Sequence, residues 1–140
     1  MSPFRNLKSN VLNRLLLDTH TFLWWVDDAP LLSDAARSVI AERGAEVWLS
    51  IASVWEMAIK QSLSKLQLPG RADRFAAEHV RLNRFRLLPV DIRHTGRVVD
   101  LPFHHRDPFD RLLIAQALED NLVLVTADAV VRSYGVPTVW

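Results

Sequence analysis

Four acidic residues stand beyond apolar runs of this sequence and could do chemistry together: Asp18, Glu56, Asp110 and Asp128. Three of them follow strand-like runs, and the fourth, Asp110, opens an apolar helical pattern. In a parallel α/β sheet the loops at the carboxyl ends of the strands share one crevice, where ligands usually bind. Carboxylates that converge there repel one another unless a cation lies between them, and Mg²⁺ or Mn²⁺ suits oxygen ligands. The pattern therefore predicts metal-assisted phosphodiester chemistry.

Each of these acids also has a purely structural explanation. Asp18 could cap a helix, and Asp128 could be an ordinary turn residue. Glu56 could complete a capping box with Ser53. If Ser50 is the true cap instead, Glu56 lies in the second turn of the helix and is free to face the crevice. These explanations do not predict that all the acids lie at the same end of the sheet.

The helix start near residue 108 holds two further signals. Asp107 suits the cap position, and Pro108 suits the first helical position. Asp110 is favoured there by the helix dipole. One acid is enough for capping, so the second acid has no structural explanation.

Side chains near the acids are weaker candidates. His104 and His105 are adjacent and have no second pair at helical spacing, which is a poor pattern for metal ligands. We expect His20 to be packed or hydrogen-bonded near the site rather than to ligate a metal. Lys60 lies four residues past Glu56 on one helical face, which suits either a routine ion pair or a phosphate contact.

The composition is that of a one-domain protein of 140 residues, 49% of them apolar and 24% charged. Cysteine is absent, which excludes disulfides, thiolate catalysis and cysteine-bound zinc. No apolar stretch approaches the roughly 20 residues that cross a bilayer, and no signal-peptide run is seen, so we expect a cytoplasmic protein.

Charge is spread unevenly along the chain. The net charge is +1, but residues 71–97 hold seven arginines and only three acids. A basic flank of this kind could hold a phosphate backbone beside an acidic crevice. A solvated helical face is the commoner explanation of a charge run.

Strand-like and helix-like patterns alternate along the chain, with turn signals between them. We expect strands over residues 11–17, 46–49, 85–90, 122–125 and 138–140. We expect helices over residues 18–26, 34–43, 50–63, 72–82, 91–100 and 108–119. The alternation predicts an α/β protein with a central, mostly parallel sheet. Residues 1–11 lack periodicity and are expected to form a flexible tail, followed by a single domain over residues 12–140.

Four segments, in this order, resemble the PIN-domain family and within it the VapC-like toxins of type II toxin–antitoxin systems. They are residues 15–20 (LLLDTH), 53–60 (SVWEMAIK), 105–117 (HRDPFDRLLIAQA) and 125–128 (VTAD). The similarity runs from about residue 15 to residue 140. It departs from the family in a longer start before residue 15 and in Ser64, which stands where glycine is common.

The resemblance implies a three-layer α/β/α fold and an endoribonuclease that depends on Mg²⁺ or Mn²⁺. It also implies inhibition by a cognate antitoxin whose tail enters the active-site groove, which would give a toxin–antitoxin hetero-oligomer. The aromatic content allows a homodimer as well. Asp18, Glu56, Asp110 and Asp128 fall on the family's acidic quartet, and Asp107 on an acid typical of this branch.

We expect Asp18 and Asp110 to be direct metal ligands. Glu56 and Asp128 would then bind through water or hold a second ion, because Mg²⁺ retains several waters. The hydroxyl of Thr19 could orient a carboxylate.

Two other classes of function stay open. A haloacid-dehalogenase-like phosphatase would use Asp18 as its nucleophile, with Ser50 and Lys60 near the phosphate. That chemistry normally has a second aspartate two residues on, where this chain has His20. A non-catalytic interaction module would bind through its tryptophans and arginines and show no metal-dependent turnover.

Overall fold

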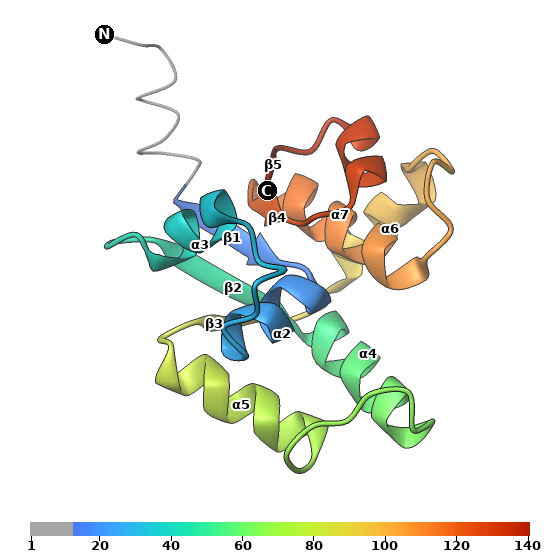
Figure 1. Ribbon diagram of the computed structural model, residues 1–140. Helices are drawn as coiled ribbons and strands as arrows, with labels where there is room; N and C mark the ends of the chain where they lie inside the picture. Colours follow the sequence, from blue (N-terminus) through green and yellow to red (C-terminus); the bar gives the residue numbers. More distant parts are fainter. Residues whose placement is uncertain (1–12) are drawn as a thin grey trace, which may run out of the picture.

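Five short parallel strands form the centre of the computed structural model, which describes residues 13–140 (Figure 1). The strands are β1 (Arg14–Leu17), β2 (Glu46–Ser50), β3 (Arg86–Leu88), β4 (Val123–Val125) and β5 (Thr138–Val139). Their order across the sheet is β3-β2-β1-β4-β5, and every neighbouring pair is parallel. All their carboxyl ends therefore lie at one edge. The tail predicted over residues 1–11 lies outside the described residues.

The central strands β1 and β4 are buried on both faces. Leu15, Leu16 and Leu17 are 0% exposed. Successive strand side chains point to opposite faces, so a strand that is covered on both faces is a continuous apolar run. Leu15 and Leu17 pack in one core cluster with Phe22, whereas Leu16 packs in a second cluster with Ile114.

Helices cover both faces of the sheet (Figure 1). They are α2 (Thr19–Val26), α3 (Asp34–Ala41), α4 (Ile51–Ser62), α5 (Ala72–Leu82), α6 (Ile92–Asp100), α7 (Pro108–Asp120) and the 3₁₀ helix η1 (Ala129–Tyr134). Buried residues of α2, α3, α4 and α5 belong to the first core cluster, and those of α7 and η1 to the second. The three-layer α/β/α arrangement is thus confirmed.

A few element boundaries differ from the predictions. The helix predicted over residues 34–43 ends at Ala41, because Glu42 is extended and the chain turns at Gly44 with φ = +89°. The strand predicted over residues 85–90 is confined to β3, beyond which Pro89 offers no N–H to a ladder. The sheet, predicted to be mostly parallel, is parallel in every pairing described. Helix η1 was not predicted.

Within residues 13–140, the structure has no helix of the length and apolarity that spanning a membrane requires. The division of the chain into a tail and a single domain stays a prediction.

Candidate active site

Asp18 and Asp128 lie at the carboxyl ends of the two central strands. Asp18 follows β1 and caps α2, where its Oδ1 accepts the backbone N–H of Thr21 at 2.8 Å. Asp128 lies just beyond β4 and caps η1, where its Oδ1 accepts the N–H of Val130 at 2.9 Å. The Asp18 N–H donates to the Val125 carbonyl at 3.2 Å, so the two strand ends are tied together. Capping occupies one oxygen of each carboxylate and leaves the other available.

Glu56 lies in the second turn of α4 and is only 4% exposed. Its Oε1 accepts the Thr19 hydroxyl at 2.6 Å, and its Oε2 contacts Lys60 Nζ at 2.6 Å. Ser50, not Ser53, caps α4 by accepting the N–H of Ala52. The capping-box explanation of Glu56 is therefore wrong, and the alternative with Ser50 as the cap is confirmed.

Asp107 and Asp110 have different roles at the start of α7. Asp107 Oδ1 accepts the N–H groups of Phe109 at 2.8 Å and Asp110 at 3.2 Å, so Asp107 is the cap. Asp110 is left for another role. Burial raises the pKa of the Asp110 carboxyl to about 7, with a further increase from the charge of Asp107.

The charges of Asp18 and Glu56 also raise the pKa of Asp110, whereas His105 lowers it. Charges act on each other in this way only over short distances in water. Among the described residues, the possible ligand atoms within 4.8 Å of one another are those of His105, Asp110 and Asp128. Asp18, Asp110 and Asp128 line an open pocket of about 280 Å³ together with His20 and Trp24.

His20 is packed near the site as predicted, with its ring 5.7 Å from the ring of Trp24. Lys60 forms the predicted ion pair with Glu56 along one helical face. The hydroxyl of Thr19 orients a carboxylate as predicted.

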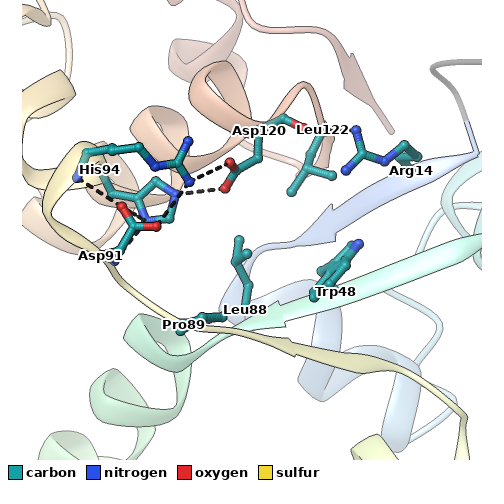
Figure 2. Close-up of a pocket in the computed structure, with 9 residues that line it drawn as sticks. Arg14, Trp48, Leu88, Pro89, Asp91, His94, Asp120 and Leu122 are labelled. Carbon is teal, nitrogen blue, oxygen red and sulfur yellow. Dashed lines mark hydrogen bonds and ion pairs between the residues drawn. The ribbon is translucent and has the colours of Figure 1, made fainter.

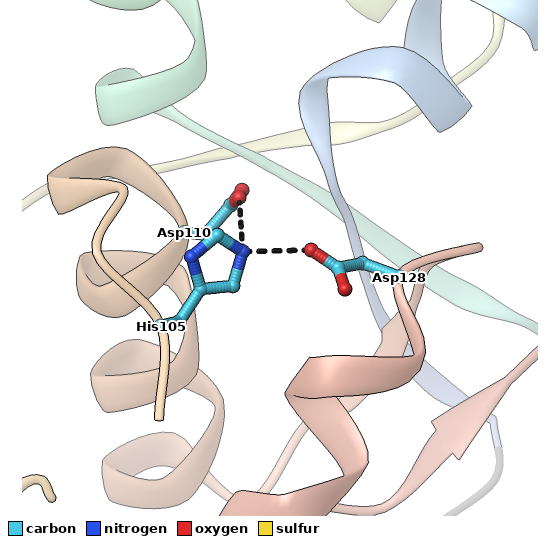
Figure 3. A group of neighbouring side chains, drawn as sticks. All are labelled: His105, Asp110 and Asp128. Carbon is cyan, nitrogen blue, oxygen red and sulfur yellow. Dashed lines mark hydrogen bonds and ion pairs between the residues drawn. The ribbon is translucent and has the colours of Figure 1, made fainter. Parts of the chain in front are cut away.

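His105 is the site residue that the sequence interpretation missed. Its Nε2 lies 2.7 Å from Asp128 Oδ2 and 3.0 Å from Asp110 Oδ2, between the two carboxylates (Figure 3). His104 instead packs its ring against Tyr134, with the ring centres 5.1 Å apart. Treating the two histidines as one pair hid this difference. The useful signal was the position of His105 two residues before the Asp107 cap, on the same loop as Asp110.

Three arginines of the arginine-rich segment form ion pairs away from the acidic pocket. Arg86 is paired with Glu46 at the start of β2, and Arg97 with Glu119 near the end of α7. Arg93 is paired with both Asp91 and Asp120. These contacts lie toward the amino ends of the strands or on α6, so for these arginines the predicted role beside the crevice is wrong.

A second pocket, of about 290 Å³, lies on the face covered by α6 (Figure 2). It is slightly larger than the acidic pocket, but it is lined by none of the four candidate acids. Its histidine and its acids are paired, since His94 Nε2 contacts Asp120 Oδ2 at 2.7 Å and His94 Nδ1 accepts the Asp91 N–H at 3.1 Å. The acidic pocket is lined by three aspartates and by no lysine or arginine, so we assign the candidate site there.

The acidic site fits a hard divalent cation. Its donors are carboxylate oxygens, which Mg²⁺ and Mn²⁺ prefer. Lys60 offsets the charge of Glu56 alone, and the pKa of Asp110 is raised first by burial and then by the charges of neighbouring acids, which a bound cation would offset. Asp18, Glu56, Asp110 and Asp128 are the residues that would hold the ion.

Comparison with known proteins agrees with this architecture. The family model of the PIN domain matches residues 15–136. Ribonuclease VapC22 of Mycobacterium tuberculosis is 32% identical over 136 residues, which cover 92% of this chain and 100% of that protein.

Solved structures have the same fold. FitAcB from Neisseria gonorrhoeae matches with a TM-score of 0.62 and 20% identity over 89% of this chain and 95% of its own. VapBC2 from Rickettsia felis, solved with a DNA fragment from its promoter, matches with a TM-score of 0.61 and 13% identity over the same shares, 89% and 95%. With its sheet order, its acidic edge and these matches, this chain belongs to the PIN domain family.

Proposed function

We propose that this protein is a metal-dependent endoribonuclease that acts as the toxin of a toxin–antitoxin pair. The observation that supports the proposal is that Asp18, Asp110 and Asp128 line one pocket at the carboxyl edge of the sheet. The 32% identity to a ribonuclease over nearly the whole chain supports RNA as the substrate.

In this proposal Asp18 and Asp110 are direct ligands of Mg²⁺ or Mn²⁺. Glu56 and Asp128 act through water or a second ion. When bound, the cation supplies positive charge to the scissile phosphate and lowers the pKa of water. Thr19 and Lys60 hold the two oxygens of Glu56 in a fixed orientation, so that this carboxylate needs little reorganisation during the reaction.

A protein partner is the second half of the proposal. FitAcB and VapBC2 are similar in fold to this chain, and one further neighbour is a toxin–antitoxin complex from Klebsiella pneumoniae. These similarities support a cognate antitoxin whose tail occupies the acidic pocket. The expected compartment is the cytoplasm, and the expected assembly is a homodimer or a toxin–antitoxin hetero-oligomer.

The phosphatase alternative finds little support in the structure. Ser50, which it needs near the phosphate, accepts the N–H of Ala52 and donates to Gln116 Oε1 at 2.6 Å. Lys60 is held by Glu56. Both groups are therefore engaged in holding α4 and its neighbours.

The proposal is tested by replacing the two expected ligands, Asp18→Asn and Asp110→Asn, in separate purified proteins. Asparagine still caps α2, so the Asp18 variant keeps its fold. We expect Mn²⁺-dependent cleavage of single-stranded RNA to fall at least about 100-fold, because several kcal/mol of charge stabilisation is lost.

Asp91→Asn is the matched control, because Asp91 caps α6 in the same way but lies outside the acidic pocket. It should cleave RNA like the unchanged protein. Full activity in both site variants would rule the mechanism out.

A further inference from the structure

The ring of His105 has a defined tautomer. Its Nδ1 accepts the backbone N–H of Asp107 at 3.1 Å. A neutral imidazole carries one proton, so a ring whose Nδ1 is an acceptor carries that proton on Nε2. Nε2 is therefore a donor to Asp128 Oδ2 at 2.7 Å, and Asp110 Oδ2 lies 3.0 Å from the same nitrogen.

This hydrogen-bond pattern is the reverse of the one found around a metal-ligating histidine. A ligating imidazole donates its other ring N–H to a carboxylate or carbonyl. Here the other nitrogen accepts a backbone N–H instead. Nε2 of His105 and one oxygen each of Asp110 and Asp128 lie within 4.8 Å of one another, a spacing that suits a metal site. The tautomer nevertheless makes His105 a donor in this cluster.

The backbone of His105 is fixed as firmly as its ring. Its N–H donates to the Tyr134 hydroxyl at 2.7 Å. Arg111, only 6% exposed, donates to that same hydroxyl at 3.2 Å and to the carbonyls of Pro102 at 2.7 Å and Leu101 at 3.2 Å. A buried guanidinium thus holds the loop that carries His105.

These contacts join His105 to both ends of η1. Asp128 caps the start of this short helix and Tyr134 ends it. The first binds the His105 ring and the second binds the His105 backbone. A shift of the loop would therefore break contacts at both ends of η1.

The protein uses the same arrangement a second time, away from the acidic site. His94 Nδ1 accepts the N–H of Asp91 at 3.1 Å, and His94 Nε2 contacts Asp120 Oδ2 at 2.7 Å. In both cases Nδ1 accepts the backbone N–H of a helix-capping aspartate, Asp107 of α7 or Asp91 of α6, so that Nε2–H is left to bind an aspartate.

We propose that His105 is a positioning residue and not a metal ligand: its Nε2–H binds Asp128 and holds it beside Asp110, a contact that we call the clasp. An N–H donor offsets part of the repulsion between two carboxylates. Asp110 and Asp128 come from separate elements, α7 and the start of η1, so the clasp fixes how far apart they lie. The inference rests on the proposed function only for what the positioned acids then bind.

The tautomer is tested directly by nitrogen NMR of protein with ¹⁵N-labelled histidine, with His94 as an internal reference. The His105 signals are identified by their loss in His105→Gln. We expect Nε2 to be protonated and Nδ1 to be the acceptor without metal, and the same pattern after Mg²⁺ is added. An Nδ1-protonated ring, or loss of the Nε2 proton on adding Mg²⁺, would overturn the proposal.

The positioning role is tested by titrating Mn²⁺ alone into purified variants by calorimetry. His105→Gln keeps an N–H donor near the place of Nε2, whereas His105→Asn reaches only the place of Nδ1. We expect the Kd for Mn²⁺ to rise about 10-fold or more in the Asn variant, as for other partners of metal ligands. In the Gln variant the rise should stay within about 3-fold, since the donor is retained.

His104→Gln is the matched control, because His104 is the adjacent histidine and is exposed. Its Kd should match that of the unchanged protein. Equal weakening in the Gln and Asn variants, or no weakening in either, would contradict the clasp.

Thermal unfolding of each variant separates loss of position from loss of fold. Tyr134→Phe removes only the hydroxyl that anchors the His105 backbone, and it should also weaken Mn²⁺ binding.

The two experiments separate this inference from the proposed function. The tautomer is measured in the metal-free protein, so it can be right when RNA is not cleaved. If His105 has the Nε2–H tautomer but the protein does not cleave RNA, only the proposed nuclease function is contradicted. If the protein cleaves RNA but His105 has the Nδ1–H tautomer, only the positioning role of His105 is contradicted.

Discussion

The charged form of Asp110 is unfavourable at this edge of the sheet, where it is partly buried beside other acids. Its pKa is raised from the ordinary value of 3.8 to about 7, first by burial and then by the charges of its neighbours. Between these two pH values the folded protein binds a proton that the unfolded chain does not. Stability is therefore lost as the pH rises from about 4 to about 7, and the full cost is present above that range.

Asp110→Asn should remove this cost. We expect the stability advantage of the variant over the unchanged protein to grow by about 1.4 kcal/mol from pH 5 to pH 8, measured by urea unfolding in EDTA. That is roughly half of what the pKa shift implies over this interval, because the side chain is 28% exposed and partly screened by solvent.

Asp73→Asn is the control for this measurement. Arg71 lowers the pKa of Asp73 below 3.8, so Asp73 is ionised at both pH values in the folded and the unfolded protein. The effect of its replacement should be the same at pH 5 and pH 8. If Asp110→Asn also has the same effect at both, the acids do not interact as described.

Among the elements, α4 is the one whose position decides where Glu56 points. Its first residues follow β2 directly, and Ser50 both caps the helix and binds Gln116 of α7. Ser53, one turn on, is 1% exposed, and its hydroxyl has no hydrogen-bond partner in residues 13–140. Two serines of one helix thus have opposite environments.

Ser50→Ala should lower the free energy of unfolding by about 2–3 kcal/mol, because it removes a cap and leaves the Gln116 oxygen without its donor. Ser53→Ala should raise it by up to about 1 kcal/mol, since a buried hydroxyl without a partner is removed. Chemical denaturation of the two variants side by side tests the pair. A loss of stability in Ser53→Ala as large as that in Ser50→Ala would contradict the contacts described.

At the scale of the whole molecule, the alternation of strands and helices was enough to predict the layers of the fold. The buried runs at residues 15–17 and 123–125 are continuous because both faces of the sheet are covered. Strand order could not be predicted, since it depends on which crossovers pack best. Helix η1 follows a turn whose 3₁₀ geometry has no periodic signal in so short a segment.

The candidate site was predictable only in part, for a physical reason. Asp18 and Asp128 follow strands, so the parallel sheet brings them together. His105 lies on a loop, and its place depends on contacts with Tyr134 and Arg111 that no local pattern specifies. The pairing of Arg86 with Glu46, 40 positions apart in the chain, is equally non-local.

Expression in cells tests the proposed toxicity and the proposed antitoxin partner together. We expect growth arrest when this chain is expressed alone, and relief when the product of the neighbouring small gene is expressed with it. The Asp18→Asn protein should not arrest growth, because its acidic site is incomplete. Growth curves measure this difference. If Asp18→Asn arrests growth as strongly as the unchanged chain, the effect is due to a non-catalytic interaction instead.

A crystal of the protein soaked in Mn²⁺ tests the central claim most directly. We predict an anomalous difference peak within bonding distance of Asp18 and Asp110, with His105 Nε2 still facing the carboxylates and outside the coordination shell. A map without a peak at these acids, or with Mn²⁺ bound only elsewhere, would contradict the account.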